Sequence, residues 1–273
     1  MENIVDYNYN FNSIRQLKFE FDLNKAEHIS LYNCLVKDNI YEKETAYFIF
    51  RCLKKGDCFI DVGASQGFFT LFASRLVGDN GLVISVEPGE DNLLGLNKNI
   101  KLNNLTNCIV YDYVLSNIKN KNKFYLNLDN GSHTLWDLTE WKSNIKSIEN
   151  PNFKYVETFT IDKIVESNKR KINIIKIDTE GAESLILKGA NTLLSNDKTL
   201  LILAELHEFG LKKLNCDQFE MRNYMKNLGY DTFILSSSLG AKPKIVLQET
   251  EIKFNQISNI LFANKNIIDK IYD

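Results

Sequence analysis

Paired cysteines, long apolar runs and a strong charge bias are all missing from this 273-residue sequence. Its five cysteines are scattered and none forms a C-x-x-C pair, which argues against both a zinc site and a disulfide framework. Reduced thiols are typical of the cytoplasm, where we therefore expect the protein. No apolar run approaches the roughly 20 residues of a membrane-spanning helix. The polar and aromatic N-terminus also lacks the apolar core of a signal peptide.

The charges of the sequence nearly balance. There are 33 Lys and Arg against 35 Asp and Glu, a formal net charge of −2, which gives no electrostatic case for a nucleic-acid partner. The hydrophobic fraction of 44% and the charged fraction of 25% are ordinary for a globular protein. The length fits one large α/β domain, which we expect over residues 41–273 after an N-terminal extension over residues 1–40. That extension is our candidate for mediating a homo-oligomer.

Short apolar runs alternate with helical patterns along the chain. This alternation predicts a mostly parallel sheet with helices on both faces. The expected strands are 58–62, 82–87, 108–111, 172–178, 199–205, 232–235 and 259–263. The expected helices include 41–53, 91–102 and 217–228, and an alternating pattern over 17–23 predicts one more strand. The stretch 124–151 is too long for a simple crossover, so we expect it to cover the active site.

A glycine turn between an apolar strand and an amphipathic helix is the most informative motif. It contains Gly63, Ala64 and Gly67, and Glu87 ends the next expected strand. Glycines let the backbone approach a ligand closely, and an acid at that strand end binds ribose hydroxyls in nucleotide-binding folds. The turn therefore predicts a nucleotide-containing cofactor.

The glycine spacing indicates which cofactor this is. A dinucleotide turn uses G-x-G-x-x-G to accommodate a pyrophosphate, whereas only Gly63 and Gly67 are present here. The carboxylate of Asp61 suits a ligand with positive charge, such as the ammonium or sulfonium of S-adenosylmethionine (AdoMet). A turn without a ligand stays open as an alternative, and an NAD-linked dehydrogenase is disfavoured by the missing glycine.

Acidic side chains also follow the later strands. Lys176 and Asp178 end the fourth expected strand, and Glu180 lies in the turn that follows it. Glu205 and His207 end the fifth strand. Because ligands bind beyond the carboxyl ends of parallel strands, these side chains should share one rim with Gly63 and Glu87. Glu183 is better explained as a favourable charge in the first turn of a helix.

Together these motifs resemble the FkbM family of AdoMet-dependent methyltransferases. The family pattern D-V-G-A-x-x-G, then E-P, then K-I-D-x-E-G-A-E is present at residues 61–67, 87–88 and 176–183. Three weaker family features also match: Y-E-x-E at 41–44, T-I-D at 160–162 and E-x-H at 205–207. The resemblance covers about residues 40–265 and leaves the first forty residues outside.

The resemblance implies a class I methyltransferase fold, with seven strands of which the last is antiparallel and with AdoMet over the first two. By position, Gly63, Ala64 and Gly67 would face the methionine part and Glu87 the ribose. Asp112 would contact the adenine amino group, with ring stacking on Tyr111 or Tyr113 as the alternative. The implied acceptor is a hydroxyl of a sugar, a glycan or a secondary metabolite.

An alcohol acceptor must lose its proton during the transfer, and a nearby Asp, Glu or His can accept it. Asp178 is our first candidate for this base, His207 the second, and Glu180 lies on the same rim. Magnesium is an alternative activator, with Asp178, Glu205 and His207 as ligands.

Other polar residues are candidates for acceptor binding. We assign His133, Lys176 and Glu205 to the substrate, although Lys176 has the simpler explanation of an ion pair. Aromatic faces of Trp136 and Trp141 would suit a sugar ring, and packing is the competing explanation. Two other functions remain open: N-methylation of a small molecule or peptide, and a non-catalytic AdoMet-binding partner protein.

Overall fold

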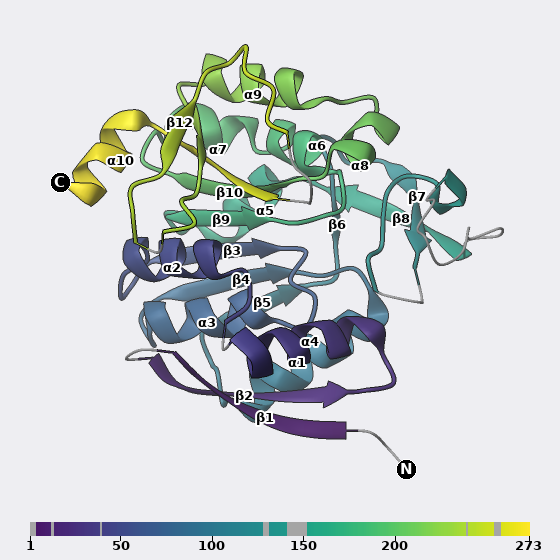
Figure 1. The fold of residues 1–273 in the computed structure, drawn as a ribbon. Helices are drawn as coiled ribbons and strands as arrows, with labels where there is room; N and C mark the ends of the chain where they lie inside the picture. The colour runs from purple at the N-terminus through teal and green to yellow at the C-terminus, as the bar shows by residue number, and fades with distance from the viewer. Residues whose placement is uncertain are drawn as a thin grey trace.

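The computed structural model describes residues 4–11, 14–38, 40–127, 131–140, 152–238, 240–253 and 258–273. Within these residues, eight strands form a central sheet in the order β12-β11-β13-β10-β9-β3-β4-β5 (Figure 1). In chain order they are β3 (Cys58–Val62), β4 (Leu82–Val86), β5 (Cys108–Tyr111), β9 (Ile174–Ile177), β10 (Leu201–Leu206), β11 (Asp231–Ile234), β12 (Lys244–Val246) and β13 (Ser258–Ala263).

The strand directions confirm the expected class I methyltransferase topology. Strands β5, β4, β3, β9 and β10 are parallel neighbours, and β13 runs antiparallel to both β10 and β11. The seven expected strands are all present, with ends that differ from the prediction by at most two residues. The edge strand β12 was not predicted, since its short run offers little alternation.

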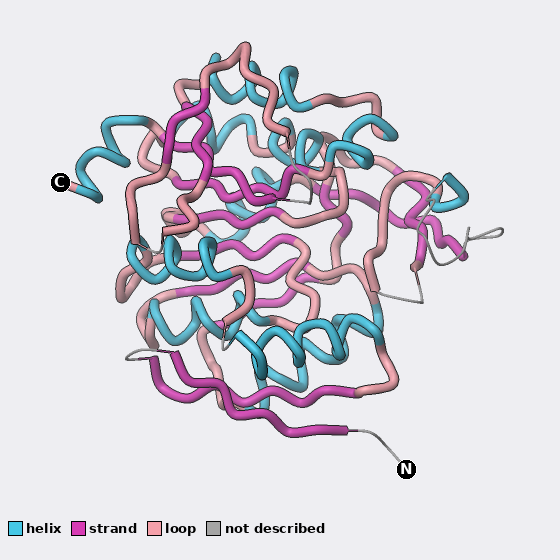
Figure 2. The backbone as a smooth tube through the Cα atoms, viewed as in Figure 1, coloured by secondary structure: helices cyan, strands magenta, loops and turns pink. Residues whose placement is uncertain are grey.

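Both faces of the central sheet are covered by helices, as Figure 2 shows. In β3, Ile60 and Val62 point to one face and Phe59 to the other, and all three are buried. The first face packs against α5 (Ile161–Asn168), α6 (Glu183–Lys188), α7 (Asn191–Asn196), α8 (Glu208–Lys213) and α9 (Gln218–Asn227). The second packs against α1 (Ala26–Asp38), α2 (Lys43–Cys52), α3 (Phe68–Val77), α4 (Glu90–Leu102) and α10 (Lys265–Tyr272). Among the helices of the described residues, none is both long and apolar enough to cross a bilayer.

The N-terminal segment packs against the same core as α3. Strands β1 (Ile4–Phe11) and β2 (Ile14–Asp22) form an antiparallel hairpin that lies beside α3 and α4 in Figure 1. Leu17, Phe19 and Phe21 are fully buried, and the ring of Phe19 stacks on Phe68 at 6.2 Å. The strand predicted over 17–23 is thus confirmed and corresponds to β2, whereas α1 was not predicted. The domain boundary near residue 40 stays a prediction, because this shared core neither supports nor excludes an independent unit.

Asn99 of α4 and Asn103, which directly follows that helix, hydrogen-bond to the backbone of β2. Asn103 accepts from the Lys18 amide through Oδ1 at 2.8 Å and donates to the Lys18 carbonyl through Nδ2 at 2.6 Å. Asn99 accepts from the Glu20 amide at 2.9 Å and donates to the Gln66 carbonyl at 3.0 Å. Asn99 therefore joins the N-terminal hairpin to the glycine turn after β3.

A small second sheet lies beside the carboxyl ends of the central strands. Its order is β6-β8-β7, formed by β6 (Val114–Leu115), β7 (Lys121–Leu126) and β8 (Asn152–Phe159). A 3-10 helix, η1, spans Leu138–Glu140. Phe124 of β7 is buried and faces the cavity described below, as expected for a segment that covers the site.

Replacing Asn103 with alanine tests the link between β2 and α4. We expect Asn103→Ala to lower the free energy of unfolding by about 1–3 kcal/mol, because the amide and carbonyl of Lys18 lose their buried partner. Urea denaturation measures this change. Asn97→Ala on the exposed side of the same helix is the matched control and should stay within about 0.5 kcal/mol of wild type. Equal effects of the two variants would contradict the assigned role of Asn103.

Candidate functional site

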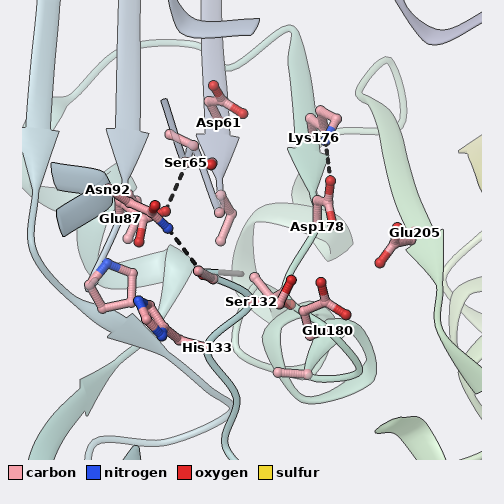
Figure 3. A pocket seen from close by; sticks show the side chains of 18 of the residues that line it. Asp61, Ser65, Glu87, Asn92, Ser132, His133, Lys176, Asp178, Glu180 and Glu205 are labelled. Carbon is pink, nitrogen blue, oxygen red and sulfur yellow. Dashed lines mark hydrogen bonds and ion pairs between the residues drawn. The ribbon is translucent and has the colours of Figure 1, made fainter. Parts of the chain in front are cut away.

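A cavity of about 510 Å³ opens at the carboxyl ends of β3, β4, β9 and β10. Its walls come from the loops after these strands, from Phe124 and the segment 131–133, and from α1. Figure 3 shows the polar side chains that these elements direct toward it. The volume lies within the range of ordinary cofactor and substrate sites.

The glycine turn brings two rim loops into contact. Gly63 has φ +78°, and a Cβ on it would lie 1.8 Å from the carbonyl oxygen of Asp178. Gly63 and Ala64 line the cavity, as predicted, but Gly67 is not among the lining residues. A Cβ on Gly67 would lie 2.5 Å from Leu96 Cδ1, so this glycine permits α4 to pack close to the start of α3.

Glu87 is held at the end of β4 by backbone amides. Its Oε2 accepts from the Ser65 amide and its Oε1 from the Gly89 amide, both at 2.8 Å. Ser65 adopts φ +48°, a conformation that few non-glycine residues take and that often marks functional sites. Burial raises the pKa of Glu87 to about 7. The carboxylate is therefore fixed in place in the cavity wall.

Lys176 forms the centre of a buried charge cluster. Its ammonium lies 2.7 Å from Asp178 Oδ2, 3.6 Å from Glu42 Oε1 and 4.7 Å from the ring centre of Phe69. Burial lowers the pKa of Lys176, but the carboxylates of Asp178 and Glu42 outweigh it and hold the pKa above its ordinary value. Lys176 therefore stays charged and orients Asp178 toward the cavity.

Asp61 lies at the end of β3, beneath the glycine turn. Its Oδ2 accepts from Thr70 Oγ1 at 2.6 Å, and burial raises its pKa. The side chain is 1% exposed yet belongs to the cavity wall. Asp61 thus adds negative charge to the floor of the site beside Gly63.

Glu180 lies in a turn that hydrogen bonds to the Glu183 side chain hold in place. Glu183 is fully buried, and its Oε1 accepts from the amides of Thr179 and Gly181 at 3.0 and 3.1 Å. This confirms that Glu183 is structural. Glu180 itself adopts φ +55°, lines the cavity and accepts a hydrogen bond from Ser132. Burial and the charge of Asp178 raise the pKa of Glu180 to about 7.

His207 supports Glu180 from behind and is not among the residues that line the cavity. Its Nδ1 accepts from the Gly210 amide at 3.0 Å, so a neutral ring carries its proton on Nε2, which lies 3.5 Å from Glu180 Oε2. Burial lowers the pKa of His207 and favours this neutral form. The close contact of Gly181 with Gly210, where a Cβ would lie 2.4 Å from the neighbouring backbone, makes this approach possible.

Comparison with known protein families identifies the group to which this site belongs. The family model described as the methyltransferase FkbM domain matches residues 61–232, well over half of the chain. The chain belongs to the FkbM methyltransferase family. It is therefore an AdoMet-dependent methyltransferase, as the sequence predicts.

Solved structures with a similar fold include other methyltransferases. A putative methyltransferase from Streptococcus mutans in complex with SAH is 12% identical, with a TM-score of 0.45, over 82% of this chain and 97% of that one. A SAM-dependent methyltransferase from Aquifex aeolicus is 15% identical, with a TM-score of 0.44, over 89% and 98%. A precorrin-6y C5,15-methyltransferase from Geobacter metallireducens is 10% identical, with a TM-score of 0.43, over 81% and 87%. A comparison with curated protein sequences gives no match.

The residues of the FkbM site fit AdoMet. The Glu87 carboxylate suits a pair of ribose hydroxyls, and Gly63 and Ala64 of the cavity wall would hold the methionine part. Asp61 and Asp178 of the cavity wall would suit the ammonium and sulfonium of the cofactor. The cofactor supplies an electrophilic methyl group on a positively charged sulfur.

The adenine end of the site differs from the expectation that named Asp112. Asp112 is exposed and absent from the lining, whereas Tyr113 lines the cavity. The reason is that the chain turns after β5 and points Asp112 outward. Tyr113 stacks on Tyr111 at 4.9 Å and on Phe159 at 4.1 Å, which fixes its ring. The alternative of an aromatic contact with adenine therefore fits the geometry better, with Tyr113 as the residue.

His133 lies at the Glu87 end of the cavity. A Cβ on Gly89 would lie 2.4 Å from His133 Cδ2 and 2.9 Å from Glu87 Oε1, so both side chains border the same glycine. His133 Nδ1 accepts from the Asn127 amide at 3.1 Å, which leaves Nε2 as the donor of the neutral ring. His133 therefore lies beside Glu87, the residue that the sequence assigns to the ribose.

The covering segment contributes differently from the prediction. Trp136 is buried outside the lining, and its Nε1 donates to the Glu180 carbonyl at 2.7 Å, so it is a packing residue. Trp141 lies outside the described residues.

In the part of the chain that the structure describes, no group of three or more His, Cys, Asp or Glu side chains is arranged to hold a metal ion.

Sequence reasoning missed several parts of the cavity wall. Ser30 and Leu31 of α1 line the site although they belong to the N-terminal forty residues. Tyr41 also lines it, and burial raises the pKa of Tyr41 far above its ordinary value. The Y-E-x-E match pointed to Tyr41, but no local pattern points to α1, because only tertiary packing brings that helix to the cavity.

Removing the Glu87 carboxylate tests the ribose assignment. We expect Glu87→Ala to weaken binding of S-adenosylhomocysteine (SAH) by about 1–3 kcal/mol, the cost of a lost hydrogen bond to a charged group. Isothermal titration calorimetry measures the affinity. Glu90→Ala removes an exposed carboxylate three residues away and should leave the affinity unchanged. An affinity of Glu87→Ala equal to that of wild type would refute the assignment.

Proposed function

We propose that this protein is an O-methyltransferase that acts on a hydroxyl of a sugar, glycan or secondary metabolite. The observation that carries the proposal is the Glu180 carboxyl, which faces the cavity and has a pKa of about 7. A general base is most effective when its pKa is near the working pH. Transfer to an alcohol needs such a base, whereas a neutral amine needs less help.

The reaction balances with Glu180 as the proton acceptor. The acceptor oxygen forms a bond to the methyl carbon, the bond between sulfur and that carbon breaks with its electron pair on sulfur, and the hydroxyl proton passes to Glu180. Alignment of these three atoms lowers the barrier, by up to about 7–11 kcal/mol in favourable cases. Ser132 and His207 hold the Glu180 carboxyl where the acceptor enters.

The remaining residues of the rim have supporting roles in this proposal. Asp178 lies between the cofactor end and Glu180, where it orients the transferred methyl and the acceptor. Lys176 positions Asp178 instead of touching the acceptor, because it is 2% exposed and already paired. Gly63, Ala64, Asp61 and Glu87 hold the cofactor. A cytoplasmic location agrees with the five cysteines, all of which are free.

Changing the proposed base should abolish turnover without loss of cofactor binding. We expect Glu180→Gln to reduce kcat by about 10²–10⁴-fold while the SAH affinity stays near that of wild type. Transfer of the ¹³C-labelled methyl of AdoMet to a panel of sugars, followed by NMR, measures turnover and shows which atom is methylated. Glu166→Gln, an exposed carboxylate on α5, is the matched control.

The pH profile gives a second test of the same base. Glu180 must be deprotonated to accept a proton, so kcat should rise as pH increases through about 7 and then level off. Glu180→Gln should remove this rise from any residual activity. A wild-type profile that is flat between pH 5 and 9 would assign the proton to another acceptor.

The variant Asp178→Asn tests whether Asp178 contributes to turnover without contributing to cofactor binding. We expect SAH to bind nearly as well as to wild type, because Glu87 and the glycine turn are unchanged. Turnover should fall, since the amide interrupts the contact with Lys176 that fixes this side chain. Calorimetry and the labelled-methyl assay measure the two effects. Normal turnover would show that Asp178 is structural.

A further inference from the structure

The end of the cavity formed by β9 and β10 carries more negative charge than its surroundings neutralise. The described residues that line the cavity include one lysine, Lys176, and five carboxylates, which are Asp61, Glu87, Asp178, Glu180 and Glu205. A surplus of buried carboxylates is unfavourable unless a ligand or a proton compensates it. A carboxylate that has no partner in the protein is therefore one whose charge a ligand or a proton must compensate.

Four of the five carboxylates have partners in the protein. Asp61 accepts from Thr70, Glu87 accepts from two backbone amides, and Asp178 pairs with Lys176. Glu180 has a hydrogen bond from Ser132 and lies near His207.

Glu205 differs from the other four carboxylates. Its Oε2 is shielded from solvent and has no hydrogen-bond partner within the described residues. Burial and the charges of Asp178 and Glu180 raise its pKa well above the ordinary value. Figure 3 shows its side chain directed toward those two carboxylates. Glu205 also lines the cavity, and no hydrogen bond or ion pair within the described residues compensates its carboxylate, so the side chain is available to a cationic ligand.

The strand order places Glu205 on the acceptor side of the cavity. Glu87 follows β4 and Glu205 lies on β10, and β3 and β9 run between them. Neighbouring strands are about 4.8 Å apart, so the two strands are separated by roughly 14 Å. The proposed cofactor occupies the β4 and β3 end. Glu205 is then available to the molecule that receives the methyl group.

We propose that the methyl acceptor carries an ammonium group and that Glu205 binds it, with Asp178 and Glu180 adding negative charge around it. This inference rests on the proposed function and narrows its substrate class to a hydroxyl compound with a protonated amine, such as an amino sugar or an amino alcohol. A charge-assisted hydrogen bond from the ammonium compensates the Glu205 carboxylate. The same charges repel acceptors that carry a phosphate or carboxylate near the reacting hydroxyl.

Two nearly isosteric probes test the ammonium site directly. Tris(hydroxymethyl)aminomethane is a protonated amino triol at pH 7, and pentaerythritol is the neutral tetraol with a hydroxymethyl group in place of the amine. Ligand-observed NMR of the full chain, saturated with SAH in phosphate buffer, measures both affinities. We expect the amino triol to bind about tenfold more tightly or better, the scale of a hydrogen bond to a charged group. Equal binding, or no binding of the amino triol, would overturn the proposal.

A pair of variants tests whether Glu205 causes the preference for the amino triol. Glu205→Gln should reduce the preference for the amino triol about tenfold. Glu208→Gln, which removes a half-buried carboxylate of α8 outside the cavity wall, should retain it. A preference that Glu205→Gln leaves intact would overturn the assignment to Glu205. The wild-type comparison of the two probes stands even if Glu205→Gln does not fold.

The same titrations separate this inference from the proposed function. Binding of SAH without an ammonium preference would refute the ammonium site alone, whereas failure to bind SAH would refute the methyltransferase site itself. Transfer of labelled methyl to the nitrogen of an amine would support the ammonium site and refute O-methylation. Binding of Mg²⁺ or Ca²⁺ that displaces the amino triol would show that the carboxylates form a metal site, and it would overturn the proposal.

Discussion

The buried ammonium of Lys176 is the interaction on which the rest of this site depends. It joins Asp178 at the end of β9 to Glu42 at the start of α2, and it lies over the ring of Phe69 on α3. Glu42 in turn accepts from Asn259 of β13. A single charge thus ties together elements that are far apart in the sequence. Removing one partner of such a buried pair usually costs about 3–5 kcal/mol, so the arrangement of the rim and the stability of the core are coupled.

Close backbone contacts hold the rim loops around this charge. Gly63 touches the carbonyl of Asp178, and Gly181 touches Gly210. Ser65 and Glu180, which face the ligands, take the left-handed conformation without being glycines. Their strain is supported by hydrogen bonds from Ser65 to Glu87 and within the turn that Glu183 fastens. Positions of this kind cluster where geometry matters more than stability.

The sequence predicts the parts of the site that follow from local pattern. Glu87 and Asp178 end apolar strands, and the parallel topology brings such ends to one edge, so both were expected at the cavity. Asp112 is exposed and absent from the lining, because the position of a side chain just after a strand depends on the turn that follows. Its neighbour Tyr113 lines the cavity instead.

Other parts of the site arise only from packing between distant elements. Ser30 and Leu31 reach the cavity because Asn99 and Asn103 fasten β2 to α4, and no short motif encodes that contact. The proximity of His207 to Glu180 depends on two glycines about thirty residues apart. The sequence placed both side chains on one rim, but it did not distinguish the residue that faces the cavity from the residue behind it.

The negative charge of the site matches the positive charge of the ligands proposed for it. In the proposed site, a cofactor with a sulfonium and an ammonium would offset Asp61 and Asp178, but it would lie toward β3 and leave the β10 end uncompensated. Burial raises the pKa values of Glu180 and Glu205, so without a ligand both carboxyls tend to hold protons. A cationic acceptor would shift Glu205 toward its charged form through direct contact. The same contact would leave Glu180 free to accept the hydroxyl proton, because one carboxylate then binds charge while the other acts as the base. Two adjacent carboxyls with different partners are a recurrent way for one site to carry out both tasks.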